Sequence, residues 1–234
     1  MSIEKQLIEL PADRKGKFGE AVCMNVLKSS GACYIPLCDM RGSSAPMATN
    51  CEAKVILPDF DLVIEGVAAY LDAKVKTQSI RFRKTGQVRH GINAKNYEHY
   101  KKMGVIQKKE CGLFIIELLD DCKNWSGSIL VESFLGLGNP VTGFNEPTPK
   151  VYWPRERFCC LGSFTASQLI DIAKGRLKVD MTSLVTTRFS APPPRCASVN
   201  RICEFVDMPL RDRRGWIKTE CRKCGTFKGY RPPT

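Results

Sequence analysis

The stretches Pro58-Asp59-Phe60-Asp61 and Asp72-Ala73-Lys74 decide the fold of this 234-residue chain, because each places acidic residues beside a short apolar segment. Residues 59–64 and 67–74 read as strands, and Glu65-Gly66 between them suits a two-residue turn. The sequence therefore predicts an antiparallel β-hairpin with acidic residues on both strands near its open end.

The register of this hairpin follows from its turn. Ile64 pairs with Val67, and counting outward places Asp59 opposite Asp72. Because side chains alternate along a strand, one face carries Asp59, Asp61, Tyr70, Asp72 and Lys74. Two opposed carboxylates repel each other unless a cation lies between them, and a hard divalent ion such as Mg²⁺ prefers oxygen ligands. The spacing predicts a metal site on this face.

This pattern resembles the motif of the PD-(D/E)xK nuclease superfamily, whose restriction-endonuclease-like core also serves Holliday-junction resolvases and virus-type replication-repair nucleases. The motif stands here as Pro58-Asp59, then Asp72, then Ala73-Lys74. Members often carry a glutamate on the preceding helix, and Glu20 fits that position. The resemblance spans roughly residues 12–120 and implies an α/β fold with a central mixed sheet flanked by helices.

Two features depart from the family pattern. The middle acid is Asp72 where most members have a glutamate, which shortens its reach. Asp61 is a second acid where members usually have an apolar residue, so either Asp59 or Asp61 could be the main metal ligand. The hairpin register favours Asp59.

The resemblance also implies the roles of the site residues. Asp59 and Asp72 would hold one or two Mg²⁺ or Mn²⁺ ions, Glu20 would bind directly or through a water, and Asp61 would be an auxiliary ligand. Lys74 would position the attacking water and stabilise the anionic transition state. The implied activity is that of an endonuclease, a hydrolase of phosphodiester bonds in DNA. RNA is not excluded as a substrate, and a homodimer is compatible because many relatives dimerise.

The distribution of charge agrees with a nucleic-acid partner. The formal net charge is +12, and the segment from Lys74 to Lys109 holds eleven Lys or Arg and one acid. Basic charge directly after the motif suggests a track for a polyanion, although a solvated basic face would look the same in sequence. The expected nucleic-acid-binding residues are Arg81, Arg83, Lys84, Arg89 and Lys95.

The remaining pattern predicts further helices and one buried strand. Residues 13–30 read as a helix capped by Asp13, and the run 113–119 suits a strand buried on both faces. Helices are also expected over 92–103 and 163–175.

The chain has two histidines that could be metal ligands. His90 and His99 have no partner at ligand spacing, so they are expected to be phosphate or surface contacts rather than metal ligands.

The C-terminal part of the chain differs in composition. Residues 191–194, Ala-Pro-Pro-Pro, read as a linker between a nuclease domain at 1–190 and a basic module at 195–234. Cys221-Arg222-Lys223-Cys224 has the spacing of a zinc knuckle. A module of about forty residues cannot build much of a hydrophobic core, so a bound zinc ion would stabilise its fold. The expected zinc ligands are Cys196, Cys203, Cys221 and Cys224.

The chain lacks the signals of a membrane or secreted protein. It has no run of about 18 apolar residues, and its N-terminus does not resemble a signal peptide. We therefore expect a cytoplasmic protein, no membrane partner, and reduced thiols among its 12 cysteines.

Two alternatives to a nuclease remain open. The chain could be a non-catalytic nucleic-acid-binding or adaptor protein on a nuclease-like fold, which the charge and the knuckle would serve equally. The hairpin could also be purely structural, with Asp72 and Lys74 forming a surface ion pair on an edge strand.

Overall fold

The structure is a computed structural model, and it describes residues 3–37, 47–50, 53–77, 80–81, 86–120, 125–143, 148–189, 205–209, 217–221 and 227–231. The chain divides into two compact units, Met1–Ser190 and Ala191–Thr234.

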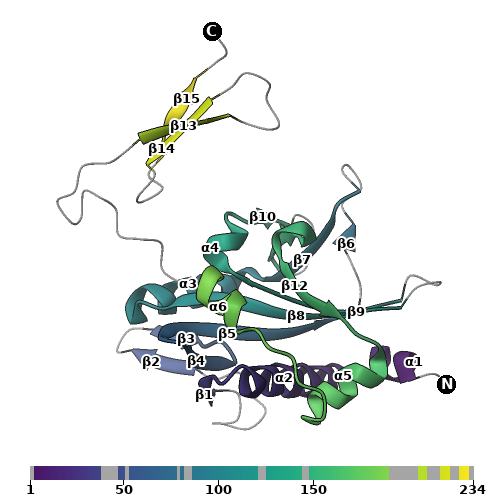
Figure 1. The fold of residues 1–234 in the computed structure, drawn as a ribbon. Coiled ribbons are helices and arrows are strands. Elements are labelled where there is room, and N and C mark those ends of the chain that lie inside the picture. Colours follow the sequence, from purple (N-terminus) through teal and green to yellow (C-terminus); the bar gives the residue numbers. More distant parts are fainter. Residues whose placement is uncertain are drawn as a thin grey trace. The chain divides into compact units, whose positions relative to one another are not determined.

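A mixed six-stranded sheet forms the centre of the N-terminal unit (Figure 1). Only β5 and β8 run parallel, and each of the other neighbours pairs antiparallel. The strand order is β1 (Cys33–Pro36), β4 (Phe60–Ile64), β5 (Val67–Lys76), β8 (Glu110–Asp120), β9 (Trp125–Ser133) and β12 (Cys159–Ser163). The prediction of an α/β fold around a mixed sheet is confirmed.

The predicted hairpin is the pair β4 and β5. Ile64 pairs with Val67, as predicted, and Glu65 and Gly66 form the turn with φ of 46° and 81°. Positive φ at both central positions is the turn geometry whose twist matches that of the two strands. The hairpin is not at the edge of the sheet, because β1 pairs with β4 and β8 pairs with β5. The alternative of a purely structural hairpin is therefore wrong in placing Asp72 and Lys74 in a surface ion pair on an edge strand, because the hairpin is internal and Asp72 is buried.

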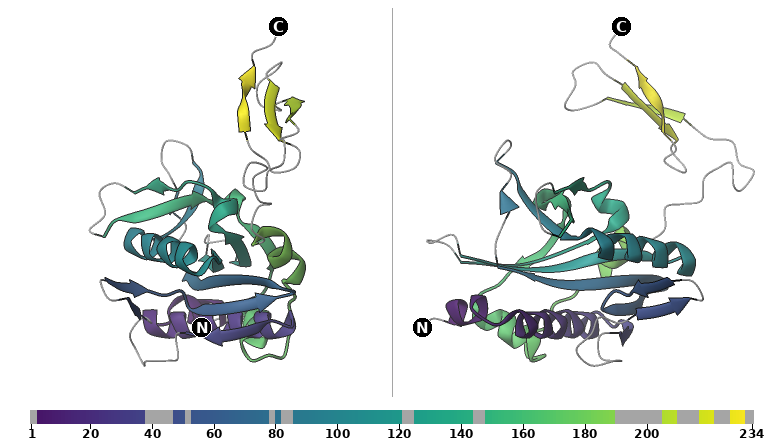
Figure 2. Two further views of the ribbon diagram at one scale, coloured as in Figure 1. Left: turned by 90° about the vertical axis from the view of Figure 1, so that its left-hand side faces the viewer. Right: turned by 180° about the vertical axis from the view of Figure 1, so that it is seen from behind.

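Helix α2 (Ala12–Ser29) covers one face of the sheet together with α5 (Ala166–Ala173), as the two turned views show (Figure 2). Its buried residues Val22 and Val26 pack into an apolar core with Phe114 of β8. The predicted cap is wrong: Pro11 occupies the N-cap position without a side-chain hydrogen bond, and Asp13 lies in the first turn. A carboxylate there still favours the helix, since it faces the positive end of the helix dipole. A short helix, α1 (Ile3–Ile8), precedes α2.

The opposite face is covered by α3 (Ala94–Gln107) and by a second sheet that was not predicted. Asn93 caps α3 by accepting a hydrogen bond from the backbone N–H of Lys95 (2.9 Å), so the helix begins two residues later than predicted. Tyr97 and Tyr100 are buried beneath it. The second sheet has the order β10 (Val141–Thr142), β11 (Lys150–Pro154), β7 (Val88–Asn93) and β6 (Ile80–Arg81).

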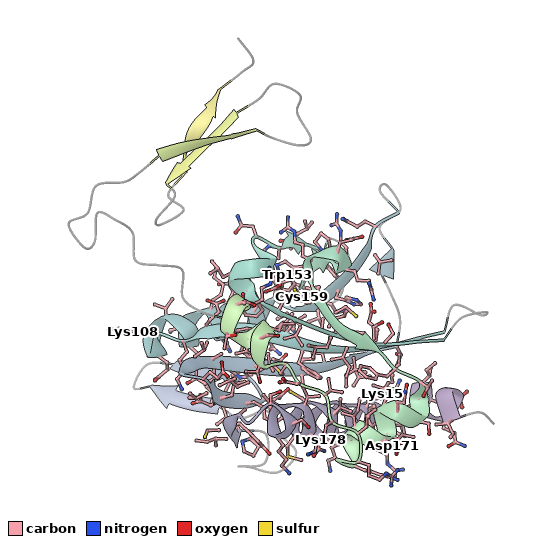
Figure 3. All side chains as sticks on the ribbon, viewed as in Figure 1. Lys15, Lys108, Trp153, Cys159, Asp171 and Lys178 are labelled. Carbon is pink, nitrogen blue, oxygen red and sulfur yellow. The ribbon has the colours of Figure 1, made fainter. Side chains whose placement is uncertain are left out.

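An aromatic cluster packs α3 and the second sheet against the central six-stranded sheet. Trp153 of β11, labelled in Figure 3, is fully buried. It stacks on Phe134 at 5.7 Å between ring centroids and meets Tyr97 edge-on at 5.3 Å. Strand β8 is buried on both faces as predicted, because Leu113 and Ile115 enter this cluster while its alternate residues enter the other core. The remaining elements are β2 (Met47–Asn50), β3 (Ala53–Ile56), α4 (Phe134–Leu137), the 3₁₀ turn η2 (Arg155–Arg157) and α6 (Thr182–Arg188).

The C-terminal unit contains a three-stranded antiparallel sheet in the order β13 (Phe205–Pro209), β14 (Ile217–Cys221) and β15 (Phe227–Arg231). The predicted linker and the expected zinc ligands Cys196, Cys203 and Cys224 lie outside the described residues. Cys221 is the last residue of β14, and only its backbone is described. Of the helices in the described part of the chain, none has the length and apolarity to span a membrane.

Helix α2 approaches β5 most closely at Gly19. A Cβ atom at Gly19 would lie 2.8 Å from Cγ2 of Val75, closer than two carbon atoms pack, whereas a Cβ at Gly16 on the same helix would meet nothing within 4 Å. The missing side chain at Gly19 therefore allows the helix to bring the next residue, Glu20, toward the open end of the hairpin.

We expect Gly19→Ala to lower the free energy of unfolding by about 1–3 kcal/mol, because the added methyl overpacks against β-branched Val75. Gly16→Ala is the matched control and should raise it by up to about 1 kcal/mol, since alanine favours a helix over glycine. Urea denaturation of both variants measures the difference. Equal stabilisation by both substitutions would show that α2 has room at Gly19.

Candidate functional site

The candidate site lies at the start of β4, beside β5. It contains Asp59, Asp72 and Lys74. Asp59 stands one residue before β4, and its Oδ2 accepts a hydrogen bond from the backbone N–H of Ala73 (2.8 Å). Nζ of Lys74 lies 2.8 Å from both carboxylate oxygens of Asp72 and 3.7 Å from Oδ2 of Asp59. The structure thus brings together the two acids and the lysine of the predicted motif.

Asp72 is held by two elements at once. Its side chain is 1% exposed, and its Oδ1 accepts hydrogen bonds from Nζ of Lys74 and from the hydroxyl of Tyr100 on α3, each at 2.8 Å. Its Oδ2 is buried and has no hydrogen-bond partner among the described residues, although Nζ of Lys74 is close to it. The ammonium of Lys74 offsets the charge of this oxygen but makes no hydrogen bond to it, so Oδ2 keeps an unused acceptor that a metal ion could bind.

Asp72 and burial change the ionisation of Asp59. Burial, and then the charge of Asp72, raise the pKa of Asp59 from 3.8 to about 7, and Lys74 opposes this shift. Burial alone would lower the pKa of Lys74, but Asp72 and Asp59 outweigh burial and raise it. Lys74 therefore stays protonated at neutral pH and acts as a cation and a hydrogen-bond donor, not as a base.

Glu20 lies at the edge of this group. It follows Gly19 on α2, and its charge contributes to the raised pKa of both Asp59 and Lys74. No hydrogen bond or ion pair joins Glu20 to the described part of the chain. It is close enough to act on the site electrostatically, in the position that the sequence predicted.

Asp61 is occupied by a different partner. Both of its carboxylate oxygens accept hydrogen bonds from Nζ of Lys109, at 2.6 and 2.8 Å, and this ammonium also lies 5.0 Å from the ring centre of Tyr70. The sequence left Asp59 and Asp61 as alternative ligands. Of the two, the structure brings Asp59 to Asp72 and Lys74.

The arrangement fits a cation bound by few protein ligands. Among the residues that the structure describes, no three His, Cys, Asp or Glu side chains gather closely enough to form a complete metal cage. Mg²⁺ does not need one, because it usually keeps several waters and binds one or two carboxylates together with substrate phosphates. The orphaned Oδ2 of Asp72 and the carboxylate of Asp59 are the donors that suit such an ion.

The expected nucleic-acid-binding residues are only partly within the described chain. Lys95 is exposed in the first turn of α3, and Arg89 on β7 donates from Nε to Oε1 of Gln87 at 3.0 Å. Arg83 and Lys84 lie outside the described residues, and Arg81 is described only in its backbone.

Tyr100 is the site residue that the sequence analysis did not assign. Its burial raises its pKa well above the usual value, as do the charges of Asp72 and Asp59, so the hydroxyl remains a donor. Its place on the apolar stripe of α3 was predictable, but nothing in the local sequence shows that its hydroxyl reaches a strand 28 residues earlier.

Comparison with known proteins adds little to this geometry. No protein-family model and no curated protein matches the sequence. The chain is similar to a solved structure of D212, a nuclease from a fusselovirus, with a TM-score of 0.35 and 12% sequence identity. That match covers 71% of this chain and 95% of the other. A likeness of this degree decides neither the fold nor the activity of this chain.

Because the pKa of Asp59 is raised in the folded state, ionisation of this carboxyl lowers the free energy of unfolding. Below about pH 4 the carboxyl is protonated in both the folded and the unfolded chain, so there is no cost. The cost grows as the pH rises from about 4 to about 7 and is fully present above that range.

We expect Asp59→Asn to raise the melting temperature of the metal-free protein at alkaline pH, by about 2–4 °C for each kcal/mol of relieved cost. The gain should shrink as the pH falls from 7 and vanish near pH 4. Asp180→Asn is a control of opposite sign, because hydrogen bonds from Thr182 lower the pKa of Asp180. Thermal unfolding in EDTA across this pH range measures both, and a pH-independent effect of Asp59→Asn would contradict the assignment.

Proposed function

We propose that this protein is a divalent-metal-dependent endonuclease that hydrolyses phosphodiester bonds in DNA. The observation that supports this most is the buried pair of Asp59 and Asp72 with Lys74 against both acids, leaving one oxygen of Asp72 without a hydrogen bond. Structural carboxylates are normally satisfied by donors of the protein itself. A site that leaves one unsatisfied and raises the pKa of its neighbour suits a ligand that brings positive charge.

Asp59 and Asp72 would hold a Mg²⁺ or Mn²⁺ ion, with Glu20 acting directly or through a water. When bound, such an ion lowers the pKa of a coordinated water and offsets the charge that develops on the phosphate. Tyr100 fixes Oδ1 of Asp72, so Oδ2 remains the available oxygen. Because the pKa of Asp59 is about 7, the site would bind a cation more tightly as the pH rises through neutrality.

Lys74 would orient the attacking water and stabilise the transition state. Its side chain is 31% exposed, more than those of Asp59 (15%) and Asp72 (1%), so it is the member of the group that an approaching phosphate can contact most easily. A protonated amine at this point neutralises the charge that the phosphate gains as the water adds. Its raised pKa keeps it in this form throughout the neutral range.

In the proposed function, the C-terminal unit would be stabilised by a zinc ion and would contact the nucleic acid. Cys196, Cys203, Cys221 and Cys224 remain the proposed zinc ligands, on the evidence of the knuckle spacing and the basic composition. A homodimer and a cytoplasmic location remain part of the proposal on the sequence evidence alone.

The second candidate function is nucleic-acid binding without cleavage. It is favoured by the absence, within the described ranges, of three gathered metal-ligating side chains, and by the pairing of Asp61 with Lys109. The two functions differ in what Lys74 does: a binding protein needs its charge, whereas a nuclease needs its position beside the acids.

Lys74→Ala should reduce the rate of cleavage at least about a hundredfold while the protein still folds and binds DNA, because it removes a donor aimed at developing charge. Cleavage of labelled linear, branched and single-stranded DNA and of RNA, with Mg²⁺, Mn²⁺ or EDTA, is the measurement. Lys28→Ala, an exposed lysine in the last turn of α2, controls for loss of one positive charge. Binding without cutting by the wild type would favour the second candidate, and full activity of Lys74→Ala would refute the role of Lys74.

Binding of the cation can be measured without activity. We expect Mn²⁺ or Mg²⁺ to raise the melting temperature of the wild type and of Asp61→Asn but not of Asp59→Asn, because Asp59 is the acid beside Asp72. A ligand at a hundred times its dissociation constant stabilises a protein by about 2.7 kcal/mol, which thermal unfolding resolves easily. A shift that is lost in Asp61→Asn and retained in Asp59→Asn would reverse the assignment of the two acids.

A further inference from the structure

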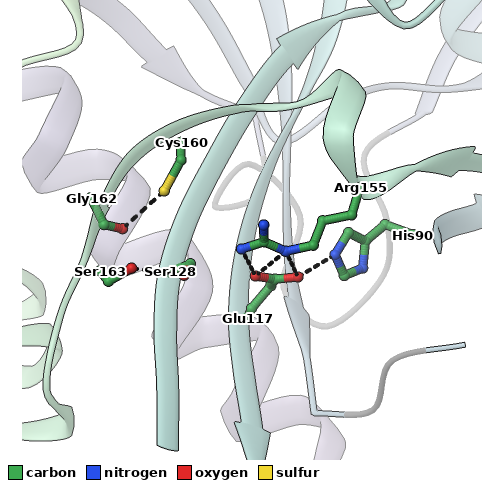
Figure 4. Close-up of polar contacts among 7 residues, drawn as sticks. All are labelled: His90, Glu117, Ser128, Arg155, Cys160, Gly162 and Ser163. Carbon is green, nitrogen blue, oxygen red and sulfur yellow. Dashed lines mark hydrogen bonds and ion pairs between the residues drawn. The ribbon is translucent and has the colours of Figure 1, made fainter. Parts of the chain in front are cut away.

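A second buried ionic group lies on the same side of the sheet as the candidate site. The carboxylate of Glu117 on β8 is fully buried between the ring of His90 on β7 and the guanidinium of Arg155, the first residue of η2 (Figure 4). Nε2 of His90 lies 2.5 Å from Oε1 of Glu117. Arg155 donates from Nε to both oxygens, at 2.8 and 2.9 Å, and from Nη2 to Oε2 at 2.6 Å. The sequence analysis expected His90 to be a phosphate or surface contact, but it is only 1% exposed.

This group holds Arg155 in one orientation. Burial would raise the pKa of Glu117, but the hydrogen bonds of His90 and Arg155 outweigh burial and lower it, so the carboxylate stays ionised. A guanidinium carries five N–H donors, and Glu117 occupies the edge formed by Nε and Nη2. Nη1 makes no hydrogen bond to the described residues, and the side chain is 36% exposed. Arg155 is therefore anchored at one edge and accessible in part.

The register of the sheet places the group next to the candidate site. In the parallel pair of β5 and β8, Lys74 is opposite Ile115 and Lys76 is opposite Glu117. Two residues along a strand span about 6.6 Å and keep the same face, so Lys76 and Glu117 continue the row that begins with Asp72 and Lys74. Nζ of Lys76 donates to the backbone carbonyl of Gly91 on β7 at 2.6 Å.

The charges of this neighbourhood are mainly positive. Burial, and then the charge of Lys74, lower the pKa of Lys76 to about 8, and Lys150 on β11 adds to the effect. Arg155 offsets the charge of Glu117, and the acid after Arg155, Glu156, is exposed and accepts a hydrogen bond from Gln87 at 3.5 Å. The excess positive charge therefore comes from Lys76 and Lys150, and Arg155 adds N–H donors to it.

We infer that Arg155, oriented by Glu117, binds a backbone phosphate of the nucleic acid next to the phosphodiester at the candidate site. The inference rests on the proposed function and extends it to a second phosphate. A planar guanidinium fixed at one edge suits an anionic oxygen at its other edge, because little conformational entropy is lost when the oxygen binds. Glu117 is the positioning residue, and His90 keeps it in place.

The test measures binding in EDTA, so that no metal-dependent cleavage occurs, with a fluorescent single-stranded oligonucleotide as the probe. We expect Arg155→Gln to weaken binding about tenfold, and to reduce the slope of log affinity against log salt by about 0.7, the value for one phosphate contact on a single strand. Glu117→Gln retains the arginine charge, so it should weaken binding while leaving the slope nearly unchanged. Arg176→Gln is the matched control, because Arg176 is also paired with a carboxylate, that of Asp171 on α5, which covers the other face of the sheet.

A variant that leaves Glu117 buried with one partner fewer could unfold, so the double variant Glu117→Gln with Arg155→Gln removes the carboxylate charge together with the cation. The inference is overturned if either Arg155 variant, folded by circular dichroism, binds with the affinity and salt slope of the wild type and of Arg176→Gln. Cleavage in Mg²⁺ or Mn²⁺ separates the two proposals. Cutting that does not respond to Arg155→Gln refutes the phosphate contact alone, binding that depends on Arg155 without any cutting refutes the nuclease alone, and absence of both binding and cutting with every form of nucleic acid refutes both.

Discussion

The buried carboxylate of Asp72 is the constraint on which the rest of the N-terminal unit depends. An ionised carboxylate away from water is tolerated only where donors and cations surround it. Here the donors come from two places in the chain, Lys74 on the same strand and Tyr100 on α3. The hydrogen bond from Tyr100 therefore fixes how α3 is rotated about its axis and where it lies along β5. The aromatic cluster of Tyr97, Phe134 and Trp153 stabilises that position.

The two faces of β5 show how one strand serves a core and a site together. Leu71 and Ala73 enter the apolar core beneath α2, whereas the residues between and after them, Asp72, Lys74 and Lys76, form a charged row on the other face. A central strand with apolar residues on both faces would be more stable, since buried charges must be compensated individually. The polar row suits a charged ligand, and under the proposed function that ligand would be a phosphodiester with a divalent cation.

The sequence predicted what depends on local chemistry. Glu65-Gly66 fixes the turn, the turn fixes the register, and the register brings Asp59 to Asp72, so the centre of the candidate site follows from about sixteen consecutive residues. The start of α2 was misassigned because a proline at the N-cap competed with the aspartate two residues later. The second sheet was missed, since its strands are short and its central pairing, β7 with β11, joins residues more than 50 positions apart, as Trp153 with His90. The contact between Glu117 and Arg155 spans 38 residues and has no local signal.

The opposite pKa shifts of Lys74 and Lys76 mark the boundary between two electrostatic environments on one strand. Both side chains are partly buried, and burial alone would lower the pKa of each ammonium group. Asp72 and Asp59 reverse the effect at Lys74. At Lys76, two residues farther along, burial prevails, the charges of Lys74 and Lys150 add to it against that of Asp72, and the pKa falls to about 8. The balance of charge along β5 therefore becomes more positive over roughly 7 Å. In the proposed reaction a metal ion would occupy the negative end, and the phosphate that follows the cleaved bond would lie at the positive end. This polarity would set the direction in which a nucleic-acid strand crosses the sheet, because reversing the strand would exchange the attacked and the leaving side of the phosphodiester at Lys74.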